Sequence, residues 1–150
     1  MKSTTITRTF PMTQKACWDL ITNIVDYPRL IDSYEAVEVT TETHEGQGAR
    51  WKQTRKVFGR SHSQDLEIIE WDPDRSLTHE AHEGGTTYQT RYVMSPSESG
   101  EGTSVEMTFT VEANGVFGRM VLAAFGERLV RSTGVQMDRD LADLSKSAIT

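Results

Sequence analysis

The stretch TSVEMTFTVEA at positions 103–113, followed by NG at 114–115, decides how this chain folds. Apolar side chains occupy every second position from Val105 to Val111, and threonine or glutamate stands between them. Such alternation predicts a strand with one face in the core and the other in water. The NG pair ends the strand. The proline-free segment over 116–147 is rich in good helix formers, so it predicts a long C-terminal helix.

The two halves of this expected helix differ in pattern. Apolar residues cover much of the first half, from Val116 to Leu129, which predicts a helix surrounded on most sides. The second half, with Leu141 and Leu144, is apolar on one side only. Three glycines interrupt the segment at spacings of eight: Gly118, Gly126 and Gly134. Each interior glycine weakens a helix by about 1 kcal/mol relative to alanine, so we expect bends or breaks.

The sequence before position 103 predicts one strand, two short helices and five further strands. Glycine and proline turn signals separate the strands. The expected strands cover 4–10, 34–43, 49–58, 62–71, 76–83, 86–94 and 103–113, and the short helices cover 16–24 and 26–31. A seven-stranded antiparallel sheet whose residues are half polar needs cover on one face only, and the C-terminal helix is the only element long enough to provide it. This indicates an α+β fold.

Composition narrows the classes of protein that fit. The chain has 150 residues, 36% of them hydrophobic and 25% charged, as in an ordinary globular domain, so we expect one domain over 1–150. No stretch reaches the roughly 20 apolar residues of a membrane span, so we expect no stable membrane insertion. Cys17 is the only cysteine, which favours a reducing, cytoplasmic setting. The net charge of −6 repels phosphate backbones and anionic headgroups, so nucleic acid is not an expected partner.

A strongly curved sheet around a single helix leaves a gap that ordinary side chains do not fill. We therefore expect an internal cavity beside residues 116–130, and a small hydrophobic molecule as its occupant. The sequence leaves open which molecule this is, whether the cavity is open without it, and the oligomeric state.

Several motifs, in this order and at these spacings, resemble one known group. They are CWDLITN at 17–23 with DYP at 26–28, EGQGAR at 45–50 leading into a strand, and GEGT at 100–103 leading into the last strand. Together they resemble the START / birch-pollen-allergen / polyketide-cyclase (SRPBCC) superfamily. The resemblance implies the helix-grip fold and a lipophilic pocket, in a group that mixes carriers, sensors and cyclases.

Strand alternation predicts which side chains face the cavity. The expected ligand-binding residues are Trp51, Gln53, Arg55, Leu66, Ile68, His79, Tyr88, Tyr92, Met107 and Phe109 on the strands, with Met120 and Phe125 on the helix. Three interpretations of Arg55 stay open: it meets a carboxylate or phenolate of the guest, it forms a salt bridge at the sheet rim with Glu67 or Asp65, or it is exposed to solvent at the strand end.

The sequence contains no metal or cofactor motif. His79 and His82 are an odd number of positions apart on an expected strand, so they point to opposite faces and cannot chelate one ion. The remaining catalytic hypothesis is general acid/base chemistry, with His79 as proton shuttle and Arg55 stabilising an enolate.

Three functions stay open at this point. The first is a carrier that binds a small hydrophobic molecule of lipid, polyketide or quinone type. The second is a polyketide cyclase or dehydratase. The third is a quinone-binding or ribosome-associated interaction protein, a branch that the DYP segment at 26–28 also resembles, although the acidic net charge argues against ribosomal RNA.

Overall fold

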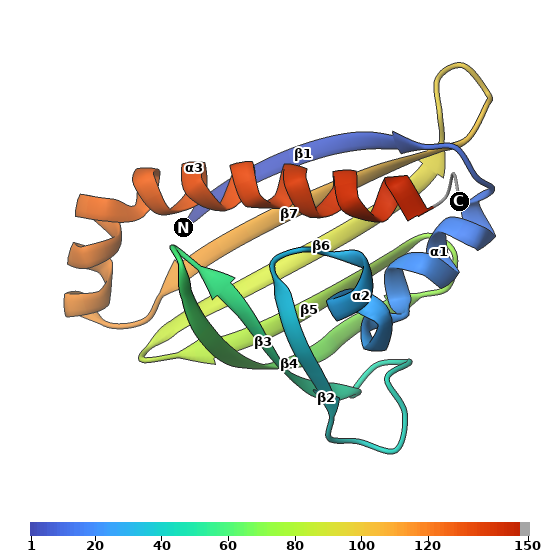
Figure 1. Ribbon diagram of the computed structural model, residues 1–150. Coiled ribbons are helices and arrows are strands. Elements are labelled where there is room, and N and C mark those ends of the chain that lie inside the picture. The colour runs from blue at the N-terminus through green and yellow to red at the C-terminus, as the bar shows by residue number, and fades with distance from the viewer. Residues whose placement is uncertain (148–150) are drawn as a thin grey trace.

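The computed structural model describes residues 1–147 and shows an antiparallel sheet that curves around one long helix (Figure 1). In chain order the elements are β1 (Lys2–Phe10), α1 (Gln14–Thr22), η1 (Ile24–Asp26), α2 (Tyr27–Leu30), β2 (Tyr34–Val39), β3 (Arg50–Val57), β4 (Arg60–Asp72), β5 (Ser76–Glu83), β6 (Thr86–Pro96), β7 (Thr103–Ala113) and α3 (Val116–Ser147). The seven strands are ordered β1-β7-β6-β5-β4-β3-β2. The predicted α+β helix-grip fold is confirmed.

The sheet is covered unevenly by its helix. β1 pairs antiparallel with β7, with Ile6 opposite Met107, and α3 packs mainly on these two strands. Register shifts interrupt β2 after Tyr34 and β4 after Ile68, and such irregularities bend a strand and increase its twist. β3 to β5 therefore curve away from α3, which leaves space between them and the helix.

The short helices close one end of this space. Thr13 caps α1, as the sequence indicates, because its hydroxyl accepts a hydrogen bond from the Ala16 amide at 3.2 Å. Cys17 and Ile21 on the inner side of α1 are fully buried. The Tyr27 hydroxyl of α2 donates to the Ile21 carbonyl, which ties the two helices together.

α3 is one continuous helix, but Figure 1 shows that its first part bends away from the axis of the remainder. A Cβ added to Gly126 would lie 3.0 Å from Lys2 Cγ, and one added to Gly134 would lie 3.0 Å from Thr4 Oγ1. These two glycines therefore let the helix approach β1 closely. None of the helices within residues 1–147 is long and apolar enough to cross a membrane.

The expectation that the first half of α3 is surrounded is wrong. Gly126 lies beside Lys2, where β1 begins, so the residues that precede Gly126 extend past the end of that strand. The sheet therefore does not cover these residues. The second half follows the prediction, since Leu141 and Leu144 are completely buried.

Candidate functional site

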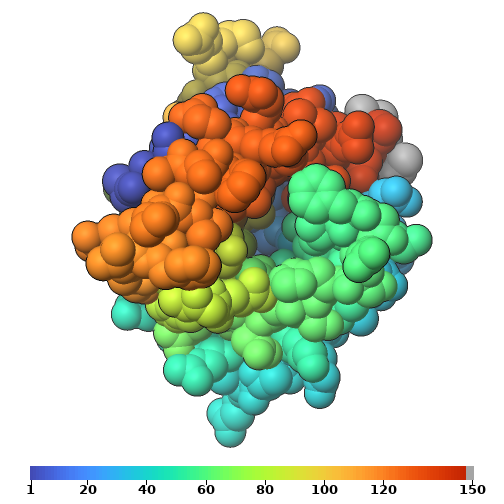
Figure 2. All heavy atoms as spheres, turned by 90° about the vertical axis from the view of Figure 1, so that its left-hand side faces the viewer, coloured from blue at the N-terminus to red at the C-terminus, as the bar shows by residue number. Residues whose placement is uncertain are grey.

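A cavity of about 1430 Å³ lies between the inner face of the sheet and α3. Figure 2 shows it as a hollow that opens between the first part of α3, in orange, and the turn joining β3 to β4, in green. Small-molecule sites in proteins typically occupy about 300–1,000 Å³, so this space admits a large guest together with water. The predicted gap between sheet and helix is present.

The cavity follows a later part of α3 than the sequence indicates. From the expected stretch 116–130 only Leu129 lines it, and the rest of the helical wall comes from positions 132–146. The shift has the same cause as the exposure of the first half of α3. Only the part of the helix that lies over the sheet can enclose a space with it.

Most of the residues expected to bind a ligand line the cavity: Gln53, Arg55, Leu66, His79, Tyr88, Tyr92, Met107 and Phe109. Trp51 and Ile68 face inward too, but they line a separate space of about 10 Å³, near α1 and α2. Met120 and Phe125 are not brought to the cavity; 64% and 61% of their surfaces are exposed. That any of these residues contacts a ligand stays a prediction.

Arg55 is the centre of a polar cluster in the cavity wall. Its Nη2 donates to Asp140 Oδ2 and to Ser33 Oγ, both at 2.7 Å, and its Nη1 donates to Tyr34 Oη at 3.2 Å. The guanidinium also lies 4.3 Å from the centre of the Tyr34 ring. Gln136 Nε2 donates to the other Asp140 oxygen at 2.9 Å. The wall therefore contains the Arg55–Asp140 ion pair, which has no net charge and is fixed by hydrogen bonds to neighbouring side chains.

The salt bridge predicted for Arg55 has a different partner in the structure, whereas its contact with a guest stays a prediction. Glu67 lies on the outer face, where its Oε1 accepts from Arg50 Nε at 2.6 Å, and Asp65 shares that face. Strand alternation places both carboxylates on the side opposite Arg55. The partner is Asp140 of α3, so a guest carboxylate would have to compete with an internal one.

The groups around Arg55 hold their ordinary neutral or charged forms. Burial acts to lower the pKa of Arg55, but Tyr34 and Asp140 outweigh it and raise the pKa overall. Burial raises the pKa of Tyr34, with Arg55 opposing, and raises that of Tyr92 well above its usual value. At neutral pH both phenols are therefore hydrogen-bond donors and not phenolates.

His79 is a neutral imidazole in the same wall. Its ring lies 5.6 Å from the Trp51 ring and 6.0 Å from the Tyr92 ring, and within residues 1–147 its nitrogens have no hydrogen-bond partner. Burial, reinforced by the charge of Arg55, lowers the pKa of His79 to about 4. It can therefore donate one hydrogen bond to a guest and accept another from it. His82 faces the other way, as predicted, and bonds Glu80.

Sequence reasoning missed the contribution of the later part of α3, at positions 132–146, and of Ser33 and Tyr34 at the start of β2. Met137, Asp140, Leu141 and Leu144 share one helical face, and only Asp140 among them is charged. Two features of the sequence could have indicated the Arg55–Asp140 pair. An acidic residue lies within an apolar stripe of the helix, and the inward Arg55 has no carboxylate partner on its own face of the sheet. No comparable signal points to Ser33 or Tyr34.

Comparisons with known proteins match these features. A family model described as polyketide cyclase / dehydrase and lipid transport matches residues 1–148. No curated protein matches the sequence.

Solved structures share the fold over nearly the whole chain. A protein from Thermus thermophilus is 19% identical with a TM-score of 0.79, covering 99% of this chain and 97% of its own. A START superfamily protein from Mycobacterium smegmatis is 12% identical with a TM-score of 0.75, covering 97% and 96%. An aromatase/cyclase from a Streptomyces species is 17% identical with a TM-score of 0.73, covering 98% and 93%. At these identities the likeness shows the fold alone.

Proposed function

The chain belongs to the polyketide cyclase / dehydrase and lipid transport family, and on this premise we propose that it binds a small hydrophobic molecule in the cavity beneath α3. The cavity of about 1430 Å³ carries the proposal. Leu66, Met107 and Phe109 supply apolar wall, and the Tyr88 ring stacks on Phe109 at 6.0 Å. A space of this size with such walls favours an apolar guest of lipid, polyketide or quinone type.

The polar groups in the wall favour a guest with a neutral polar end. Arg55 is already neutralised by Asp140, and His79 is uncharged with free donor and acceptor capacity. A hydroxyl or carbonyl of the guest can bond His79 without removing a charge from its partner. A guest carboxylate meets Asp140 close to Arg55 and is repelled by it. We therefore propose alcohols, phenols and ketones as ligands in preference to free acids.

A screen of lipophilic compounds read by thermal unfolding tests this proposal. Ligand at one hundred times its dissociation constant stabilises the folded state by about 2.7 kcal/mol, which raises the melting temperature by several degrees. Neutral ligands should stabilise more than the matching acids. If no lipophilic class shifts the melting temperature, the binding proposal fails.

A cavity-filling variant shows where the ligand sits. Ala81 is buried and lines the cavity, so Ala81→Phe should take up part of the space and abolish the ligand shift. Ala36→Phe places the same side chain at an exposed position of β2 and should leave the shift unchanged. A ligand that stabilises both variants equally binds elsewhere.

His79 supports a second candidate, a cyclase or dehydratase activity. The unpaired imidazole faces the cavity and is unprotonated at neutral pH, so it is free to accept a proton from a carbon beside a guest carbonyl, although its pKa of about 4 makes it a weaker base than an ordinary imidazole. Arg55, predicted to stabilise the enolate that forms, is already balanced by Asp140, so its charge contributes little to this step. His79→Gln should then abolish turnover of a polyketide substrate and keep ligand binding, whereas the outward His82→Gln should change neither. Full turnover in His79→Gln rejects this candidate.

We propose the cytoplasm as the location. Cys17 is the only cysteine, it is completely buried, and burial raises the pKa of its thiol to about 12. A single cysteine cannot form a disulfide within the chain, so the protein requires no oxidising compartment. Cell fractionation tests the assignment, and recovery of the protein outside the cytoplasmic fraction contradicts it.

A further inference from the structure

Exposed apolar side chains gather on two segments beside the cavity opening, which together we call the rim: residues 57–60 and 116–125. Phe58 is 81% exposed and Phe117 is 79% exposed. Most of the large hydrophobic residues that are exposed within 1–147 belong to the rim: Val57, Phe58, Val116, Phe117, Met120, Val121 and Phe125. Scattered apolar residues are ordinary on a protein surface, but a cluster marks a contact site.

The two rim segments face each other across the opening. Val57 and Phe58 line the cavity, and Figure 2 shows the turn that carries them on one side of the hollow and the first part of α3 on the other. Phe58 also has a backbone φ of +51°, a conformation that bulky residues rarely adopt. A strained phenylalanine in water adds nothing to folding stability, which indicates a role outside the fold.

The charge around the rim is opposite to that of the whole chain. The net charge is −6, yet positions 55–62 and 116–126 contain no aspartate or glutamate. Lys56, Arg60 and Arg119 stand beside the exposed apolar residues, and none of them has a carboxylate partner within residues 1–147. Among the nearby carboxylates, Glu127 pairs with Lys2 at 3.0 Å, Glu83 contacts His62 at 3.0 Å, and Glu35 accepts a hydrogen bond from Ser61 at 2.6 Å.

We propose that the rim docks on the surface of an anionic lipid bilayer. Phe58 and the apolar residues at the start of α3 enter the headgroup region, and the unpaired cations meet lipid phosphates. The acidic remainder of the chain is repelled, so only the orientation with the cavity opening toward the bilayer is favoured. Two copies meeting rim to rim would bring unpaired cations together, which argues against self-association. Docking on the bilayer does not depend on the proposed function. When the cavity binds a hydrophobic ligand, docking lets that ligand pass between bilayer and cavity without crossing water.

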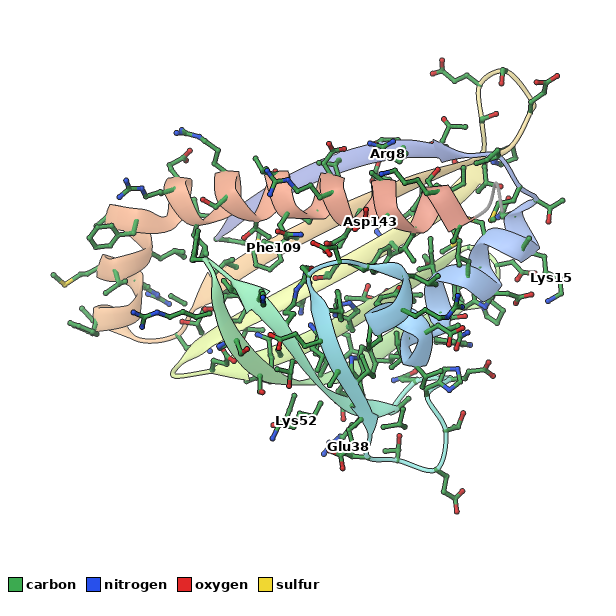
Figure 3. The ribbon with its side chains drawn as sticks, in the orientation of Figure 1. Arg8, Lys15, Glu38, Lys52, Phe109 and Asp143 are labelled. Atoms are coloured by element: carbon green, nitrogen blue, oxygen red, sulfur yellow. The ribbon has the colours of Figure 1, made fainter. Side chains whose placement is uncertain are left out.

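Flotation with phosphatidylcholine vesicles, alone or with about one-third phosphatidylglycerol, tests the proposal. The protein should bind the anionic vesicles, and high salt should weaken this binding because exposed charges are screened. Each cation near an anionic surface contributes about a five-fold change in partitioning, so Lys56→Ala should bind about five-fold more weakly. Lys52→Ala is the matched control on the same strand, and Figure 3 shows Lys52 pointing away from α3. Its binding should be unchanged.

Apolar variants complete the test. Phe58→Ser and Phe117→Ser should each weaken vesicle binding roughly ten-fold, because each removes a side chain from the apolar contact. Val25→Ser removes an exposed apolar residue on η1, away from the rim, and should have no effect. Equal loss in Val25→Ser, or no vesicle binding by the wild type, overturns the proposal.

Two measurements separate this proposal from its alternatives. If sedimentation shows a wild-type dimer that Phe117→Ser dissociates, the rim is an interface between copies and docking on lipid is rejected. Ligand binding in solution should survive in Phe117→Ser, because Phe117 does not line the cavity and the wall around His79 is intact. If ligand binding persists while vesicle binding is absent, docking fails and the proposed function stands.

Discussion

The two halves of α3 both contain apolar residues, but these residues have opposite surroundings. Leu141 in the second half has no exposed surface, whereas Phe117 in the first half lies almost entirely in water. The difference comes from the sheet, because β1 begins at Lys2 and the helix extends past it. Apolar content therefore does not decide burial here; position over the sheet does. We call residues 137–144 together with Arg55 the anchor, as opposed to the rim.

The largest expected difference between anchor and rim is in folding stability. Leu141→Ala should lower the free energy of unfolding by about 4 kcal/mol, because it removes completely buried methyl groups and leaves a cavity. Met120→Ala in the rim should change it by less than about 0.5 kcal/mol, since its side chain is already in water. Urea denaturation followed by circular dichroism measures both. Similar losses in the two variants would show that the first half of α3 packs against the fold in solution.

The charge pair of the anchor gives the next largest effect. Asp140→Leu leaves Arg55 buried without a counter-ion and should cost about 3 kcal/mol. The double variant Arg55→Met with Asp140→Leu should recover most of this loss, because it removes both charges from the wall. Denaturation of the two single variants and the double variant forms a cycle that isolates the coupling. Additive losses would mean that the pair contributes nothing.

The anchor could be predicted from sequence only in part. Alternation along β3 places Gln53 and Arg55 inward because glycine-containing turns hold the hairpins in register. The spacing of Leu141 and Leu144 identifies the covered side of the helix. The partner of Arg55 could not be read in the same way, since Asp140 lies 85 positions away and their meeting depends on how α3 is rotated over the sheet.

The rim shows where pattern alone fails. An apolar helix segment predicts burial against other elements. Whether the first half of α3 is buried depends on where β1 starts relative to Gly126, and only the tertiary structure shows this. The local sequence of the β3–β4 turn was more informative. Gly59 indicates a tight turn, but the sequence placed Phe58 at the end of the strand over 49–58, whereas β3 ends at Val57 and Phe58 lies in the turn.

His79 should make stability depend on pH through the cavity wall. Its pKa falls from 6.5 in the unfolded chain to about 4 in the folded one, so below pH 6.5 the unfolded state binds more protons. This contribution to stability is complete above pH 6.5 and is lost as the pH falls toward 4, by about 2 kcal/mol between pH 7 and pH 5.

Comparison of two histidine variants isolates this effect. His79→Phe should flatten the dependence of unfolding free energy on pH between 7 and 5, measured by urea denaturation at each pH. The exposed His62 near the rim gives the second variant: His62→Phe keeps His79 in place, so a flattening seen only in His79→Phe belongs to the cavity wall. An unchanged slope in His79→Phe would show that the imidazole is hydrated or paired in solution.

The smallest expected effect is a gain in stability at the rim. Phe58 and Gly59 both have positive φ, of 51° and 78°, as in a two-residue turn of type I′, which favours Asn-Gly. Phe58→Asn should therefore raise the free energy of unfolding by about 0.5–1 kcal/mol, because asparagine tolerates this conformation and an exposed phenyl ring is removed. The same variant should bind anionic vesicles more weakly than the wild type. Gain of stability with loss of docking would show that the rim keeps an unfavourable residue for contact with lipid, whereas a loss of stability would mean that Phe58 packs on the fold and that the contrast between rim and anchor is smaller than the structure indicates.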